Sequence, residues 1–240
     1  MIREGRHVML GIGALLLATM LIWPVWKAQA KTSTNLLTAE EIARMRSSRD
    51  WPGVDIGSVL ATASRWMKYS PQELRDMVPP ASVPRAFDTH FDQCPQHSEE
   101  IKAFGSYPWI IDPDRPYKLI CPVGGEEYPT NDFDPQKPGN PADVSSEPYV
   151  DYGWGWKSPG DPQKYWFVAY YAHWLYHGHL RPAALALGRA YVLTGDPKYA
   201  TQAVALLDRI AEEYPYMDHV NQSRYGTEIQ VGTYHGRILN

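Results

Sequence analysis

Prolines recur every few residues between positions 82 and 160, and this stretch limits the folds open to the chain. Proline lacks a backbone N–H and fixes its own φ angle, so it ends helices and is excluded from the middle of a sheet. Neither a long helix nor a broad sheet fits here. Disordered segments are poor in aromatic residues, yet this stretch is rich in tyrosine and tryptophan. We predict an ordered, irregular segment folded over a helical body.

Helical signals lie on both sides of this segment. Before it, apolar spacing predicts helices over 38–48, 56–69 and 70–79, the last opened by Ser70-Pro71. After it, we predict helices over 161–177 and 182–193 and a third from 197 to Pro215, with Gly178 and Gly195 as the stops between them. Short loops force antiparallel neighbours. The predicted fold is therefore mainly α, built of stacked helical hairpins in a closed toroid or an open solenoid.

The first thirty residues have the three parts of a secretory signal peptide. Arg3 and Arg6 make a positive start, an apolar run follows from Val8 to Trp23, and Ala28-Gln29-Ala30 is a small-x-small cleavage site. The alternative is an uncleaved membrane anchor, since the run is close to the ~18 residues at which a span becomes possible. In both cases the rest of the chain crosses the membrane, so we expect a secreted or periplasmic protein.

Removal of residues 1–30 takes away three basic residues and one acidic residue, so the net charge falls from −4 to −6. A mature domain this acidic argues against nucleic acid as a partner, because the phosphate backbone favours basic surfaces. An anionic sugar polymer remains compatible, since a cleft can be locally positive on an acidic protein.

Cys94 and Cys121 are the only cysteines, and two structural interpretations of them remain open. In an exported chain the default is a disulfide between them, which we favour. The alternative is a structural zinc ion bound by His90, Cys94, His97 and Cys121, because zinc takes tetrahedral sets of nitrogen and sulfur ligands. The Cys-x2-His spacing of Cys94 and His97 suits a metal knuckle. After Cys121, however, Gly124 stands where a Cys-x2-Cys pair would place its second ligand.

Several further blocks are more specific when taken together. They are Arg85-Ala86-Phe87-Asp88, Cys94-Pro95-x-His97, Tyr107-Pro108-Trp109, Cys121-Pro122-Val123-Gly124-Gly125-Glu126, Tyr128-Pro129-x-Asn131-Asp132 and Asp151-x-Gly153-Trp154-Gly155-Trp156. With the helical runs Leu193–Ala200 and Leu207–Ala211, they resemble the N-terminal region of heparinase II/III-like polysaccharide lyases. The resemblance covers about Trp51 to Asn240. Its helical part is not specific, because many toroids and repeat proteins use such helix pairs.

The resemblance implies an α/α toroid followed by a large β-sandwich domain, and β-elimination on uronate-containing polysaccharides. It also implies that an Asn-His pair and a catalytic tyrosine come from later in the toroid and from the following domain. This chain contains no Asn-His dipeptide. We therefore expect a signal peptide (1–30), N-terminal helices with the irregular segment (31–160) and the start of a truncated toroid (161–240). The missing toroid and β-sandwich portion would hold the main catalytic residues.

A small set of residues are candidates for binding an anionic polysaccharide. Trp154 and Trp156 could stack on sugar rings or fix their glycine-rich loop to the helical body. Arg224, Tyr225 and His235 follow the last predicted helix, and Tyr225 lies in a loop, where binding residues concentrate. The remaining candidates for neutralising a uronate carboxylate or accepting its C5 proton are His173, His177, His179, Tyr234 and Arg237.

Two other functions fit the same pattern. One is a non-catalytic helical carbohydrate-binding or scaffold domain, and the other is a glycoside hydrolase on an α/α toroid. A hydrolase needs two placed carboxylates, whereas Glu99-Glu100, Glu126-Glu127 and Glu212-Glu213 resemble solvated faces or turns. In all three cases we expect no cofactor apart from the alternative of structural zinc.

The cleavage site can be tested directly. In protein exported by a bacterial host, we expect a mature N-terminus at Lys31, because Ala28 and Ala30 supply the small residues that signal peptidase requires. Intact-mass spectrometry of the purified protein measures this. Recovery of the chain from the cytosol with Met1 in place would contradict the prediction.

Overall fold

The computed structural model describes residues 37–48, 51, 53–83, 93–140, 144–160 and 164–217. By its internal contacts the chain divides into two units, Met1–Thr38 and Ala39–Asn240, and the fold described below is that of the second. The predicted signal peptide and its cleavage site lie outside the described residues. Among the helices described, none is both long enough and apolar enough to cross a lipid bilayer.

Three helices precede the proline-rich segment: α1 (Ala39–Ser48), α2 (Ile56–Trp66) and α3 (Pro71–Met77). Ser70 and Glu73 form a reciprocal capping box at the start of α3, where each side chain accepts a backbone N–H of the other residue. All three predicted helices are present. The second ends at Trp66, which is earlier than the predicted end at Tyr69.

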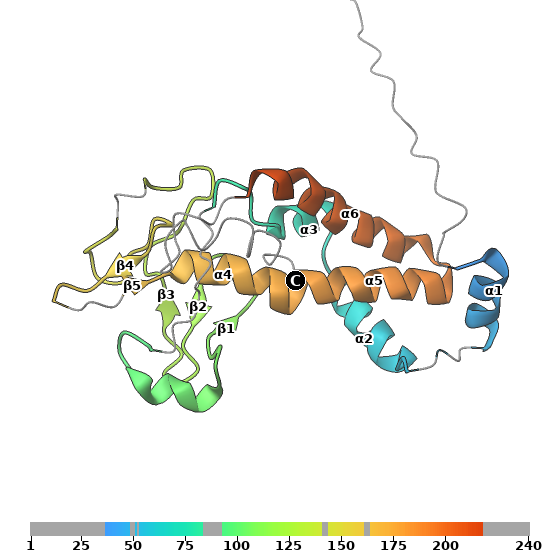
Figure 1. Cartoon of the computed structure of the whole chain (residues 1–240), viewed down its shortest axis with the longest axis horizontal. Helices are drawn as coiled ribbons and strands as arrows, with labels where there is room; N and C mark the ends of the chain where they lie inside the picture. Colours follow the sequence, from blue (N-terminus) through green and yellow to red (C-terminus); the bar gives the residue numbers. More distant parts are fainter. Residues whose placement is uncertain are drawn as a thin grey trace, which may run out of the picture. The chain divides into compact units, whose positions relative to one another are not determined.

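The helices after the segment differ from the prediction. α4 (Phe167–Leu175), a π-helical turn η2 (Tyr176–Leu180) and α5 (Arg181–Thr194) follow one another without a break (Figure 1). The predicted stop at Gly178 is therefore wrong, and the two predicted antiparallel neighbours form one continuous helix.

Pro182 gives the physical reason for the π turn. A proline inside an α-helix clashes with the carbonyl four residues earlier and cannot donate to it. The wider π turn directly before Pro182 accommodates the proline, so the chain continues as a helix where Gly178 would otherwise permit a stop.

α6 (Pro197–Glu213) doubles back beside α5 after a tight turn (Figure 1). Gly195 makes the turn with a φ of +72°, and Asp196 caps the new helix with its carboxylate. α5 also packs against α1 and α2, and α6 packs against α3, where Arg75 forms an ion pair with Glu212. A 3-10 turn η3 (Tyr214–Tyr216) follows α6. The body is thus mainly α, as predicted.

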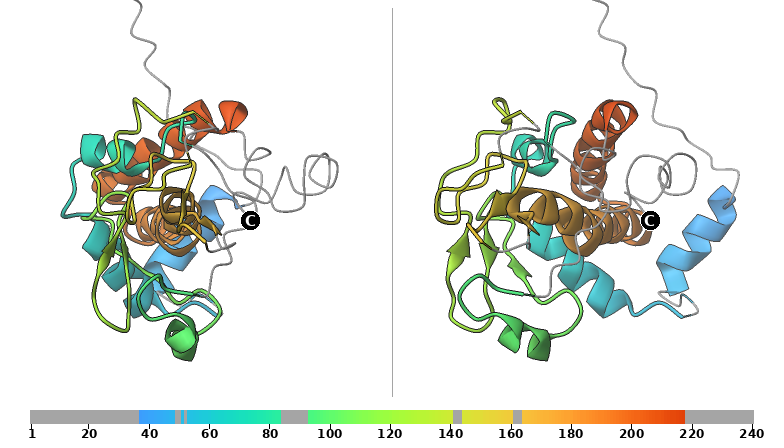
Figure 2. Two further views of the ribbon diagram at one scale, coloured as in Figure 1. Left: turned by 90° about the vertical axis from the view of Figure 1, so that its left-hand side faces the viewer. Right: turned by 60° about the vertical axis from the view of Figure 1, so that its left-hand side comes forward.

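The proline-rich segment is irregular wherever it is described, and its regular elements are short. It contains a 3-10 helix, η1 (Glu99–Phe104), and strands of two residues. β1 (Ile110–Ile111), β2 (Leu119–Ile120) and β3 (Glu127–Tyr128) form an antiparallel sheet, and β4 (Trp156–Lys157) pairs with β5 (Lys164–Tyr165). The segment gathers around α4 (Figure 2). The helix predicted from residue 161 begins only at Phe167, after β5.

Aromatic rings join the irregular segment to the start of α4. Phe167 is fully buried, and its ring stacks on that of Tyr128 with centroids 5.1 Å apart. The rings of Trp109, Trp156 and Tyr165 lie 5.8 to 6.3 Å from that of Phe167. Each such pair contributes about 0.5–1.5 kcal/mol beyond the burial of its area. The first turn of α4 is therefore held inside an aromatic core.

Asp151 is a fully buried carboxylate in this core. One of its oxygens accepts the backbone N–H groups of Gly153 and Gly155 at 2.7 and 2.8 Å, and the other accepts that of Val168 at 3.1 Å. Val168 lies in the first turn of α4, whose own N-cap residue makes no side-chain hydrogen bond. Asp151 thus caps α4 from a distance in sequence. Glycine is required at 155, because φ is +88° and a Cβ would lie 2.6 Å from the side chain of Lys164.

The role of Asp151 predicts a large loss of stability in the Asp151→Ala variant. Three buried N–H groups would lose their acceptor, and each loss costs about 1–3 kcal/mol. We expect the free energy of unfolding, measured by urea denaturation, to fall by at least about 3 kcal/mol. Asp151→Asn keeps one acceptor oxygen and should lose less. The control Asp132→Ala removes a fully exposed carboxylate and should change stability by less than about 0.5 kcal/mol. An Asp151→Ala variant as stable as this control would contradict the capping role.

Candidate metal centre and tyrosine groove

The candidate metal centre begins with a tight turn over Cys94–Ser98. Cys94 and Ser98 exchange both of their backbone hydrogen bonds, at 2.8 and 2.9 Å. Within this turn, Sγ of Cys94 lies 3.6 Å from Nδ1 of His97. The Cys-x2-His spacing therefore brings two potential ligand atoms together, as the alternative zinc interpretation requires.

The second part of the centre is the turn between β2 and β3. Cys121 directly follows β2, and it is held by backbone hydrogen bonds of 2.8 Å to Gly125 and to Glu126. Gly125 has a φ of +81°, which glycine adopts at no steric cost. This turn places Sγ of Cys121 3.6 Å from Nδ1 of His97. Both sulfur atoms are thus equally close to one imidazole nitrogen.

The two cysteines are not joined in the structure. Cys94 and Cys121 are each 1% exposed and carry free thiols, so the favoured disulfide is not formed. The ligand atoms of Cys94, His97 and Cys121 all lie within 4.8 Å of one another. The sulfurs are arranged around the His97 nitrogen instead of being bonded to each other, and the disulfide stays a prediction.

The donor set fits zinc in its chemistry and in its spacing. In a tetrahedral site, zinc bonds of about 2.3 Å to sulfur and about 2.0–2.1 Å to nitrogen place the two ligand atoms about 3.6 Å apart. Both sulfur–nitrogen distances here are 3.6 Å. Magnesium and calcium prefer oxygen ligands, so thiols and an imidazole do not suit them. Over the described ranges, this is the one group of three or more such side chains close enough to hold an ion.

Burial disfavours the thiolate form of Cys121. It raises the pKa of the Cys121 thiol, and the neighbouring Cys94 adds to that rise. Burial also raises the pKa of Tyr128, whose hydroxyl oxygen accepts a hydrogen bond from the Cys94 thiol at 3.8 Å. Coordination to a divalent cation favours the thiolate over the thiol. A bound cation would therefore oppose the effect of burial on the pKa of Cys121.

The predicted sugar-binding tryptophans are fixed in different ways. Trp156 is 5% exposed and packs against Tyr149, Tyr165 and Phe167, so it is a core residue and presents no open face to a sugar. Trp154 is half-buried and donates its indole N–H to the carbonyl of Gly139. The loop-fixing interpretation is therefore the correct one for Trp156.

The other candidates are not brought to the metal centre. His173 and His177 are half-buried with ring centroids 5.8 Å apart, and Trp174 lies against both rings. Burial lowers the pKa of His179. The residues that lie outside the described ranges are His90, Arg224, Tyr225, Tyr234, His235 and Arg237.

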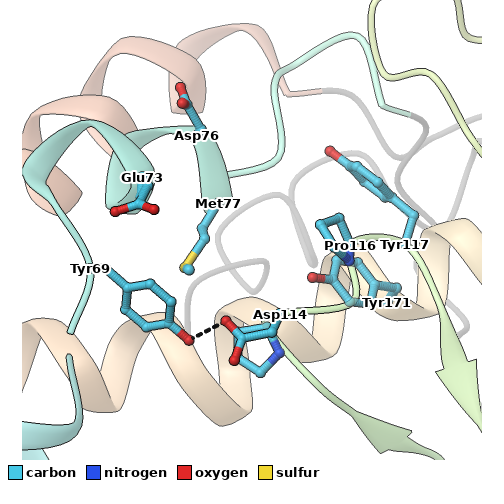
Figure 3. A pocket seen from close by; sticks show the side chains of 9 residues that line it. Tyr69, Glu73, Asp76, Met77, Asp114, Pro116, Tyr117 and Tyr171 are labelled. Carbon is cyan, nitrogen blue, oxygen red and sulfur yellow. Dashed lines mark hydrogen bonds between the residues drawn. The ribbon is translucent and has the colours of Figure 1, made fainter.

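A hollow of about 270 Å³ lies between α3, α4 and the loop that precedes β2 (Figure 3). Tyrosines and carboxylates dominate its wall. The hydroxyl of Tyr69 donates to Asp114 at 2.7 Å, and Lys68 pairs with the other oxygen of that carboxylate at 2.6 Å. The lining residues are Tyr69, Glu73, Asp76, Met77, Pro113, Asp114, Pro116, Tyr117 and Tyr171. They span a hundred positions in the sequence, so no local motif could have identified them.

Two further hollows adjoin the first. One shares Tyr69 with it and adds Arg65, and the other shares Tyr117 with it and adds Arg75 and Arg209. We call the three hollows together the tyrosine groove. Its middle is acidic and aromatic, and its ends carry basic side chains.

Glu73 and Asp114 do not have the properties of a hydrolase pair. Hydrogen bonds from Ser70 lower the pKa of Glu73, and Lys68 and Tyr69 lower the pKa of Asp114. Both carboxylates are ionised at neutral pH. A glycoside hydrolase instead needs one carboxyl whose raised pKa keeps it protonated as the general acid. These two residues suit hydrogen-bond acceptance from a ligand better than acid catalysis.

Comparison with known proteins identifies no relative of this chain. No protein-family model, no curated protein and no solved structure matches the chain.

Proposed function

We propose that the described part of the chain is a zinc-stabilised unit of an exported protein that acts on polysaccharides. The observation that supports zinc binding is the placement of two buried thiols at equal distance from one imidazole nitrogen. Cys94, His97 and Cys121 would hold the ion, which supplies a cross-link between two turns of the irregular segment. No catalytic step is assigned to it.

The cross-link has a clear structural purpose. Strands of two residues do not hold a sheet together by themselves. Cys121 leads into the turn before β3, and Tyr128 in β3 stacks on Phe167 at the start of α4. An ion at Cys121 and Cys94 would therefore stabilise the packing of the irregular segment on the helical body.

Zinc content and its removal test this role. We expect one zinc per purified chain, measured by plasma mass spectrometry. Removal by a strong chelator should lower the thermal midpoint of unfolding by at least about 5 °C, because binding energy at a structural site contributes to folding. Cys121→Ser should give the same loss, while Ser146→Ala should not. Zinc-free protein with Cys94 linked to Cys121 in non-reducing peptide maps would contradict the proposal.

The activity we propose is the one implied by the resemblance to heparinase II/III-like lyases, the cleavage of uronate-containing glycans by β-elimination. We also propose that α5 and α6 belong to an α/α toroid. The side chains of Leu185, Val204 and Leu207 support this, because each is 52% exposed on these two helices. Large apolar side chains on a helix surface are suited to packing against neighbouring helices.

The tyrosine groove supports a second candidate, a non-catalytic carbohydrate-binding role. Tyrosine rings can stack on sugar rings, and ionised carboxylates accept hydrogen bonds from sugar hydroxyls. The acidic middle of the groove, with Glu73 and Asp114, would repel a uronate. A neutral glycan therefore fits this groove better than an anionic one.

Binding measurements separate the two candidates. By calorimetry, we expect neutral oligosaccharides to bind the full chain and the Tyr69→Ala variant to bind them about tenfold more weakly, because a lost ring contact costs about 1 kcal/mol or more. Lys137→Ala, at an exposed site outside the groove, should leave binding unchanged. Binding of uronate oligosaccharides with release of unsaturated uronate ends, unaffected by Tyr69→Ala, would favour the lyase and remove the groove from consideration.

A further inference from the structure

A fourth potential ligand lies next to the metal centre, and it is not one that the spacing of cysteines and histidines indicates. Oε2 of Glu126 lies 3.5 Å from Nδ1 of His97, the same nitrogen that lies 3.6 Å from each sulfur. In a tetrahedral zinc site, an oxygen and a nitrogen ligand are about 3.4 Å apart. The carboxylate is therefore at ligand distance from the imidazole.

The carboxylate also lacks the partner that its burial requires. Oε2 of Glu126 is buried and receives no hydrogen bond in the part of the chain that the structure describes. A buried anionic oxygen is costly unless a cation or a donor compensates it. The carboxylate oxygens do not lie within 4.8 Å of all three other ligand atoms, so Glu126 must rotate to reach an ion between the sulfurs. Its side chain is flexible and 30% exposed, which leaves room for that rotation.

Gly124 explains how the carboxylate reaches this position. A Cβ at residue 124 would lie 2.2 Å and 2.6 Å from the two carboxylate oxygens of Glu126 and 2.4 Å from the His97 ring. The φ of Gly124 is not in the left-handed region, so its backbone does not require glycine. The glycine is needed for space. Glu126 fills the place that a side chain at 124, the second position of a Cys-x2-Cys pair, would take.

We propose that Glu126 is the fourth protein ligand of this centre, which makes it a closed site of two thiolates, one imidazole and one carboxylate. This inference rests on the zinc binding proposed above. Four protein ligands leave no open position for water or substrate, which is the mark of a structural zinc site. The Gly124 position and Glu126 then act as one unit, in which the glycine makes room for the ligand.

The test compares zinc affinity among variants of the full chain, by competition with a chromophoric chelator. Glu126→Ala and the size-matched Glu126→Gln should each weaken zinc binding by at least about tenfold. The matched control is Glu127→Gln, since that neighbouring carboxylate pairs with Arg115 instead, and it should bind zinc as the wild type does.

Cobalt substitution gives a second readout that does not depend on affinity. We expect the visible spectrum of the Co²⁺ form to be tetrahedral in the wild type and to change in Glu126→Gln. Unchanged zinc affinity and an unchanged cobalt spectrum in Glu126→Gln would overturn the assignment. So would loss of zinc in His90→Ala with no loss in Glu126→Gln, which would make His90 the fourth ligand. A wild-type chain that binds no zinc would instead refute the metal centre as a whole.

Discussion

The carboxyl group of Asp151 is buried among aromatic rings, where burial raises its pKa and where a polar group must find hydrogen-bond partners within the protein. It accepts the main-chain N–H groups of Gly153, Gly155 and Val168. Its own backbone is held in turn by the side-chain amide of Asn131, through bonds of 2.9 and 3.1 Å. One buried carboxyl group thereby helps to determine the path of a loop and the residue at which the long helix begins.

The irregular segment depends on two attachments of different kinds. Asp151 holds its last part to α4 by hydrogen bonds, and the candidate metal centre, with zinc as we propose, lies in its first part. Tyr128 connects the two regions, because its hydroxyl accepts a hydrogen bond from the Cys94 thiol while its ring stacks on Phe167. A segment with so little regular structure needs such attachments, since short strands contribute few hydrogen bonds of their own.

Local signals in the sequence predicted the parts of the fold that local interactions determine. The capping box at Ser70 and the turn at Gly195-Asp196 are present as predicted, because each is completed within a few residues. The start of α4 was predicted too early, since the helix begins at Phe167 and its cap comes from Asp151, in a distant part of the sequence. The predicted stop at Gly178 failed because glycine permits a stop without forcing one.

The candidate sites also differ in how far local sequence signals could predict them. The Cys94-x2-His97 spacing indicated a pair of ligands, and the structure brings that pair together with Cys121. Spacing could not distinguish a disulfide from a metal site, because that choice depends on where the His97 ring lies between two distant turns. No local sequence pattern predicted the tyrosine groove, since Tyr69, Asp114 and Tyr171 come from three separate parts of the chain.

The unbroken helix from Phe167 to Thr194 has a mechanical consequence. Its first turn is fixed in the aromatic core, and its last turns pack against α1, α2 and α6. No loop separates these two regions along the helix, so neither can hinge freely about the other. The π turn at Tyr176–Leu180 is the one departure from α-helical geometry on this path. Because π turns interrupt the regular ladder of hydrogen bonds, bending of the helix is concentrated there, two residues before Pro182.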